Sequence, residues 1–152
     1  MPNVRKSVIV PRPCTTMFDL VEDIEHYPDF LPWCSGAEVL ERTAKATRAR
    51  LAIDYHGLEM QFTTLNRKER PRRMTMELAE GPFERLAGEW RFVPLGEEGC
   101  RVEFSLDYEL ASSMLGAVLA PVFGQIAETL VDHFVARAEH AGKRGARRAR
   151  GR

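Results

Sequence analysis

Apolar residues recur at two different spacings along the chain, and each spacing predicts a different kind of element. Residues 4–10 alternate sufficiently between apolar and polar positions to predict a first strand. From Met17 the apolar residues recur at i, i+3, i+4 and i+7, which predicts a short amphipathic helix. Because Pro28 limits any continuation of this helix, we expect a second, short helical turn within residues 24–33.

The central part of the chain has an apolar period of two, which is typical of strands with one buried face. The His-Gly pair at 56–57 predicts a two-residue hairpin connection in which Tyr55 pairs with Leu58. The same register places Leu51 opposite Phe62 on the apolar face. This agreement between the turn and the apolar pattern supports the predicted hairpin.

The clearest strand covers residues 100–110, where apolar and polar side chains alternate throughout. A register that places Trp90 opposite Phe104 also places Arg91 opposite Glu103. An aromatic pair would then lie on the buried face and an opposite-charge pair on the exposed face, which favours this register. In total, six antiparallel strands are expected after the two short helices.

A long helix is expected next, beginning at Ser112 or Ser113 and ending near Ala141, before Gly142. Only this helix is large enough to cover the apolar face of a seven-stranded sheet. The order of elements therefore predicts an α+β fold in which a curved, seven-stranded antiparallel sheet surrounds the C-terminal helix. Residues 1–141 would form one domain, followed by a tail over 142–152.

A curved sheet and a helix cannot stay in contact along their whole length, so we expect a hydrophobic cavity between them. The segment HYPDFLPWC at 26–34 carries four large apolar or aromatic residues between prolines, and we expect it to close the cavity as a lid. An apolar pocket of this kind is typical of small-molecule sites. In the alternative interpretation, the same side chains fill the groove solidly as core. The predicted cavity and lid residues are Phe30, Leu31, Trp33, Leu51, Ile53, Met60, Phe62, Met76, Trp90, Phe92, Phe104, Val118 and Val122.

The charge of the chain is unevenly distributed, although its 22 basic and 22 acidic residues balance. The last ten residues, KRGARRARGR, carry six basic residues and no acidic one, so the rest of the chain is acidic. Such a tail is typical of a solvated, disordered extension, and the alternative is contact with RNA or an anionic membrane surface. The candidate RNA contacts are Lys143, Arg144, Arg147 and Arg148.

Compartment and chemistry are indicated mainly by missing patterns. Neither a secretory signal nor a transmembrane segment is expected, and three cysteines without CxxC spacing favour a reducing, cytoplasmic location. The four histidines lack metal-ligand spacing, and nothing in the sequence would orient His26 as a base for Cys34. We therefore expect no catalytic residue, no metal site and no required cofactor.

Three motifs resemble a known family. They are Y-P-x-F-L-P-x-C at 27–34, P-F-x-x-L-x-G-x-W-x-F at 82–92, and CRVEFSLDYEL at 100–110 followed by a C-terminal helix. Over about residues 2–140 the chain resembles START-type, polyketide cyclase-like proteins. The match is to the branch of the bacterial ribosome-association toxin and the mitochondrial coenzyme Q-binding protein. The resemblance implies a helix-grip fold with a hydrophobic cavity, but it does not extend to the basic tail.

Three functions remain open at this point. The first is non-enzymatic binding or chaperoning of an isoprenoid quinone, with ubiquinone as the bound ligand, in support of respiratory electron transport. The second is a ribosome-associating regulator that binds the large subunit and blocks subunit joining. A cyclase-type enzyme is the third. A cytoplasmic location, peripheral to the inner membrane, fits the first function.

Overall fold

The computed structural model describes residues 3–55 and 57–150, with side chains described for 3–55, 57–114 and 116–139. Its strands all belong to one antiparallel sheet in the order β1-β7-β6-β5-β4-β3-β2. The elements are β1 (Asn3–Val10), α1 (Cys14–Glu22), the 3-10 helix η1 (Ile24–Asp29), β2 (Cys34–Arg42), β3 (Ala46–Tyr55), β4 (Leu58–Glu69), β5 (Arg73–Glu80), β6 (Phe83–Leu95), β7 (Gly99–Leu110) and α2 (Ser113–Arg150).

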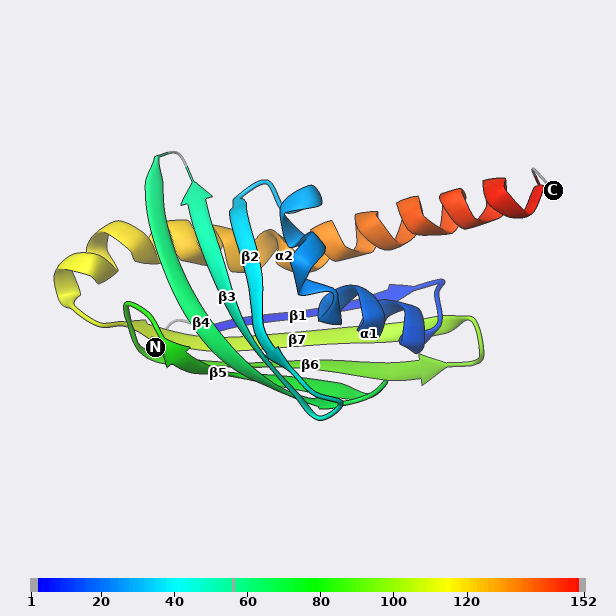
Figure 1. Cartoon of the computed structure of the whole chain (residues 1–152), viewed down its shortest axis with the longest axis horizontal. Helices are drawn as coiled ribbons and strands as arrows, with labels where there is room; N and C mark the ends of the chain where they lie inside the picture. The colour runs from blue at the N-terminus through cyan, green and yellow to red at the C-terminus, as the bar shows by residue number, and fades with distance from the viewer. Residues whose placement is uncertain (1–2, 56, 151–152) are drawn as a thin grey trace.

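The sheet is strongly curved, and α2 lies across its concave side (Figure 1). Strands β2, β3 and β4 cross the direction of β5, β6 and β7 steeply, so that the two groups of strands embrace the helix (Figure 1). The inward face needs this cover because its side chains are mostly apolar and buried. The predicted fold, a seven-stranded antiparallel sheet gripping a C-terminal helix, is confirmed.

Both predicted strand registers are confirmed. Tyr55 pairs with Leu58 across the β3–β4 hairpin, and the same ladder places Leu51 opposite Phe62. Gly57 in the connection has a φ of 83°, which suits glycine, whereas residue 56 lies outside the described residues. Strands β6 and β7 place Trp90 opposite Phe104 and Arg91 opposite Glu103.

The C-terminal helix is longer than expected. It begins at Ser113 as predicted but continues to Arg150, so the expected end at Ala141 is wrong and the boundary at 142 falls inside α2. Pro121 lies within the continuous helix. The stretch Gly116–Glu139 is long and apolar enough to cross a bilayer by length and composition, but it includes the residues that pack into the sheet.

The two short helices close one end of the groove. Phe18 of α1 is fully buried and meets the ring of Phe92 edge-on, with 5.6 Å between centroids. Lys68 Nζ of β4 lies 2.6 Å from Glu22 Oε1, which ties α1 to the end of that strand. The predicted second helical turn is η1, which is shorter than the expected range because the chain becomes irregular after Phe30.

Candidate functional site

The groove between sheet and α2 contains a cavity of about 80 Å³. Five strands, α2, η1 and the segment before β2 contribute to its wall. Only three of the lining side chains, Trp33, Thr64 and Asn66, carry polar atoms besides the hydroxyl of Tyr27. The residues that line the cavity are Ile24, Tyr27, Trp33, Ala49, Leu51, Ile53, Phe62, Thr64, Asn66, Met76, Leu86, Trp90, Phe104, Leu106, Phe123, Ile126, Ala127, Leu130 and Phe134.

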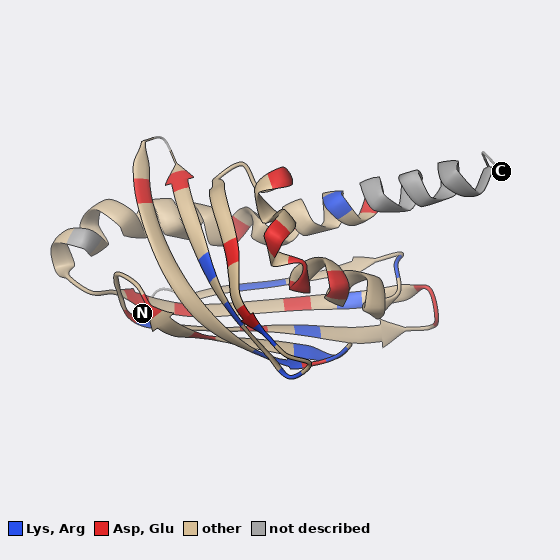
Figure 2. Ribbon diagram, in the orientation of Figure 1, with Lys and Arg blue, Asp and Glu red and all other residues tan. Residues whose placement is uncertain are grey.

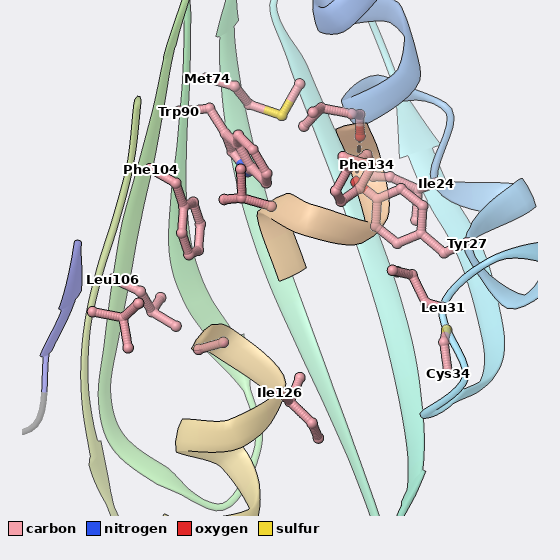
Figure 3. Packing of buried hydrophobic residues seen from close by; sticks show 14 of the residues in the cluster. Ile24, Tyr27, Leu31, Cys34, Met74, Trp90, Phe104, Leu106, Ile126 and Phe134 are labelled. Atoms are coloured by element: carbon pink, nitrogen blue, oxygen red, sulfur yellow. Dashed lines mark hydrogen bonds between the residues drawn. The ribbon is translucent and has the colours of Figure 1, made fainter. Parts of the chain in front are cut away.

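Aromatic side chains close the cavity at the end nearest η1. The ring of Phe134 on α2 meets Trp90 at 5.2 Å and Tyr27 at 5.3 Å, both edge-on. Trp90 also contacts Phe104 of the neighbouring strand, with 4.6 Å between ring centroids. Figure 3 shows Trp90 and Phe104 projecting from adjacent strands, with Tyr27 and Phe134 beside each other across the groove. These contacts anchor the lid to both the helix and the sheet.

A second group of rings lies farther toward the N-terminal end of α2. Phe123 meets Phe83 at 5.1 Å and Tyr108 at 4.7 Å, both edge-on. Phe62 of β4 completes the group and packs against Phe83 at 5.6 Å. The cavity therefore lies between two aromatic clusters, with α2 contributing one phenylalanine to each.

The lid segment folds inward, as predicted. Trp33 is 5% exposed and lines the cavity, and its backbone oxygen accepts a hydrogen bond of 2.9 Å from Asp54 N of β3. Tyr27 donates its hydroxyl proton to the backbone oxygen of Val21, and burial raises the pKa of this phenol. Leu31 is 1% exposed, so the lid buries both an aromatic and an aliphatic side chain.

One wall of the cavity is polar where β4 pairs with β3. Thr64 and Asn66 of β4 line the cavity and are almost fully buried, as is Thr47, which lies directly opposite Asn66. Three buried atoms near this wall have no hydrogen-bond partner: Trp33 Nε1, Asn66 Oδ1 and Thr47 Oγ1. Buried polar groups in native proteins are normally paired, so these atoms indicate places where a ligand or water bonds.

Seven of the thirteen predicted site residues line the cavity. They are Trp33, Leu51, Ile53, Phe62, Met76, Trp90 and Phe104. Val118 is wrong as a cavity residue, because it is 56% exposed on the first turns of α2. The other predicted residues outside the lining are Phe30, Leu31, Met60, Phe92 and Val122.

Two of these exclusions have a clear structural cause. Phe92 points to the same side of β6 as Trp90, but α1 covers it and Phe18 occupies the adjoining space. Phe30 lies on the outer side of Phe134, at 5.2 Å, and the guanidinium carbon of Arg137 stands 5.2 Å above its ring. Both residues support the walls of the cavity from behind.

Sequence reasoning missed the polar wall and much of the helix wall. Thr64 and Asn66 continue the inward alternation of Phe62, so the period of two was the available signal. On α2, Ile126, Leu130 and Phe134 belong to the predicted apolar stripe, but nothing local indicates which members of the stripe face a cavity. The side chains of Lys143, Arg144, Arg147 and Arg148 lie outside the described residues, so their RNA contacts stay a prediction.

The titratable groups near the lid are engaged in structural contacts. The thiol of Cys34 donates to the backbone oxygen of Gly36 at 3.3 Å, and burial raises its pKa, which favours the unreactive thiol. His26 Nδ1 lies 2.7 Å from Asp23 Oδ1, which raises the pKa of the imidazole. Within the described part of the chain, no three acidic, histidine or cysteine side chains gather to hold a metal.

The sequence matches known proteins over nearly its whole length. A family model described as polyketide cyclase / dehydrase and lipid transport matches residues 10–135. The ribosome association toxin RatA of Pseudomonas aeruginosa is 39% identical over 137 residues, which cover 90% of this chain and 95% of that protein. The mitochondrial coenzyme Q-binding protein coq10 of Schizosaccharomyces pombe is 27% identical over 142 residues, covering 89% and 85% respectively.

Solved structures share the same arrangement. The protein TTHA0849 from Thermus thermophilus has a TM-score of 0.79 and 28% identity, covering 92% of this chain and 99% of that one. The Zhui aromatase/cyclase from a Streptomyces species has a TM-score of 0.75 at 22% identity, covering 91% and 93%. The second likeness shows a common fold, and a common fold does not carry a common chemistry.

Proposed function

The chain belongs to the polyketide cyclase / dehydrase and lipid transport family, and we propose that it binds a hydrophobic small molecule between the sheet and α2. The observation that carries the proposal is the largely apolar cavity, closed by a lid whose Trp33 points into it. Apolar burial of about 25 cal/mol per Å² supplies affinity without any catalytic group. The protein acts as a carrier or chaperone of its ligand rather than as an enzyme.

An isoprenoid quinone, with ubiquinone as the type, is the ligand that we propose. The name of the Schizosaccharomyces pombe relative supports this choice, as does a cavity whose wall combines rings, aliphatic chains and a few polar atoms. In this role the protein works in the cytoplasm, at the surface of the inner membrane, and supports respiratory electron transport.

The ligand must enlarge the cavity when it enters. A cavity of about 80 Å³ is roughly half the size of the ~150 Å³ cavity known to accept benzene. Three wall residues, Leu51, Met76 and Leu130, are only half-buried and have flexible side chains that can move aside. Met76 is the most adaptable of these because its side chain is unbranched.

Titration of the full chain with decylubiquinone tests the proposal. We expect quenching of tryptophan fluorescence, since Trp33 and Trp90 both line the cavity, and a rise in Tm. Ala127→Leu fills the cavity from α2 and should weaken binding more than about tenfold. Ala136→Leu, the same change at an exposed position of the same helix, is the matched control. Unchanged emission and unchanged Tm for the wild-type chain would reject the proposal.

Ribosome association is a second candidate function. It is favoured by the name of the Pseudomonas aeruginosa relative and by the basic residues after position 142. Figure 2 also shows Lys and Arg gathered where the β2–β3 and β4–β5 hairpins end, and the turn there contains Arg70, Arg72 and Arg73. Arg50, on the outer face, is instead paired with Glu38 at 3.2 Å.

Co-sedimentation with purified ribosomal subunits tests the second function. We expect binding to weaken steeply between ~50 and ~200 mM salt, because contacts to phosphates release counterions. Replacing Lys143, Arg144, Arg147 and Arg148 with Gln should reduce binding further. Replacing the exposed Arg5 and Arg101 with Gln is the control for loss of charge elsewhere. Binding that ignores both salt and the tail would exclude this mechanism.

A further inference from the structure

The polar wall of the cavity has no structural explanation among the contacts of the fold. Asn66 and Trp33 are each 5% exposed, and both line the same cavity. Asn66 Oδ1 and Trp33 Nε1 nevertheless have no hydrogen-bond partner. Leaving a buried polar group unpaired costs about 1–3 kcal/mol, so two such groups in one cavity indicate bonds made to something that enters it.

The inward positions of β4 separate structural polar groups from unexplained ones. Two residues beyond Asn66, the buried side chain of Lys68 bonds Glu22 of α1 at 2.6 Å. That pair holds α1 on the sheet, so its polarity is explained by the fold. Asn66 lies one inward position closer to the cavity, where no element of the fold supplies a partner for its oxygen.

The two groups together specify hydrogen-bonding chemistry. The indole nitrogen of Trp33 can only donate, so its partner must carry an acceptor oxygen or nitrogen. Asn66 presents a carbonyl oxygen to the cavity, and rotation of its amide would present NH2 instead. It can therefore meet a hydroxyl or a carbonyl equally well.

The rest of the wall excludes a charged head group. None of the described side chains that line the cavity is a lysine, arginine, aspartate or glutamate. A phosphate or carboxylate at this depth would be a buried charge without a counter-charge, which is very unfavourable. A neutral group that carries oxygen meets no such penalty.

We propose that Asn66 and Trp33 form the polar anchor of the site and select a neutral ligand whose apolar body ends in carbonyl or hydroxyl oxygen. The inference rests on the proposed binding of a hydrophobic small molecule and specifies its chemical class. Quinones and quinols belong to this class, whereas phospholipids and ionised fatty acids do not. Thr47, opposite Asn66 in the β3–β4 ladder, is a further polar group within reach of Asn66.

Calorimetry with two matched probes tests the inference on the full chain. Decylubiquinone carries the oxygen atoms, and decylbenzene offers a ring and chain of similar apolar surface without them. Asn66→Leu removes the amide at similar volume, and Trp33→Phe removes the indole N–H but keeps an aromatic ring. Each should weaken decylubiquinone binding about threefold to tenfold and leave decylbenzene binding unchanged.

Met76→Leu is the control, because Met76 pairs with Asn66 across β4 and β5 but offers no hydrogen bond of this kind. It should affect both probes alike. A second readout is the Tm of the ligand-free protein, which Asn66→Leu should leave unchanged or raise, since an unpaired polar group is removed.

The outcomes separate the two proposals. If neither probe binds the wild-type chain, the proposed function itself fails. If both probes bind, and Asn66→Leu and Trp33→Phe leave the preference for decylubiquinone intact, the anchor is refuted while the carrier function stands. A marked fall in Tm for Asn66→Leu would assign Asn66 a structural role and would also refute the anchor.

Discussion

The two halves of the concave face differ in the chemistry of their inward side chains. In β3 and β4 the inward rows contain three buried polar residues, Thr47, Thr64 and Asn66. In β6 and β7 the inward positions that face the cavity are all apolar: Leu86, Trp90, Phe104 and Leu106. Both halves are equally buried, so burial alone does not account for the difference.

The comparison indicates a division of labour within one sheet. The β6–β7 half holds the helix, since Trp90 touches Phe104 on the sheet and Phe134 on α2 at ring distances of 4.6 and 5.2 Å. The β3–β4 half retains unpaired oxygen atoms on Thr47 and Asn66 that cost stability. Stability is concentrated in the first half, and the proposed recognition of a ligand in the second.

The largest expected effect follows from truncating the apolar half. Trp90→Ala should lower the free energy of unfolding by about 3–5 kcal/mol, because it removes a ring that is 2% exposed and opens a void beside α2. Urea denaturation measures the loss. Thr47→Val is the contrasting change in the polar half, and it should be neutral or stabilising. Equal losses in the two variants would end the division proposed above.

The next largest effect concerns the buried pair at the end of β4. Glu22→Gln should cost about 3 kcal/mol, because it leaves the ammonium of Lys68 buried, with 3% of its side chain exposed, and without a counter-charge. Adding Lys68→Met should recover most of this loss. Denaturant midpoints of both single variants and the double variant form the test. A double variant no more stable than Glu22→Gln would contradict this assignment.

A smaller effect is expected where the two halves meet. A Cβ on Gly88 of β6 would lie 2.6 Å from Met76 Cε, so Gly88→Ala should push the tip of Met76 toward the cavity. We expect decylubiquinone affinity to fall about threefold or more while stability changes by about 1 kcal/mol. Gly36→Ala is the control, because its Cβ would meet Ala52 at an ordinary 3.7 Å. Unaltered affinity in Gly88→Ala would show that the cavity does not depend on this approach.

The smallest effect concerns the outer tether of the lid. Arg42 donates two hydrogen bonds of 2.8 Å to Glu25 and holds the pKa of that carboxyl at about 2. Because this value lies below the ordinary 4.5, the stabilisation is present above pH 4.5 and is lost as the pH falls toward 2. The Glu25 side chain is 44% exposed, so the contribution should stay below about 1 kcal/mol.

Arg42→Gln checks this prediction through urea midpoints on both sides of that range. The difference between variant and wild type should be present near neutral pH and should shrink at about pH 3. A difference that is the same at both pH values would assign the effect of Arg42 to packing rather than to its charge.

Local patterns in the sequence determined the strands, their order and two registers of the sheet. The Tyr55–Leu58 and Trp90–Phe104 pairings followed because side chains alternate with a period of two and a shift of one residue would reverse every face. The end of α2 did not follow, since Gly142 lies inside the helix that continues to Arg150. A glycine permits a helix end but does not enforce one.

Only the tertiary structure decided which inward residues face the cavity. Phe92 and Trp90 share one face of one strand, yet α1 covers the first and leaves the second at the cavity wall. Asn66 is polar, and its sequence gives no sign of burial; it is buried because the curved sheet and α2 enclose β4 at that point. Periodicity assigns a side chain to a face, but the curvature of the sheet and the position of the helices determine what that face meets.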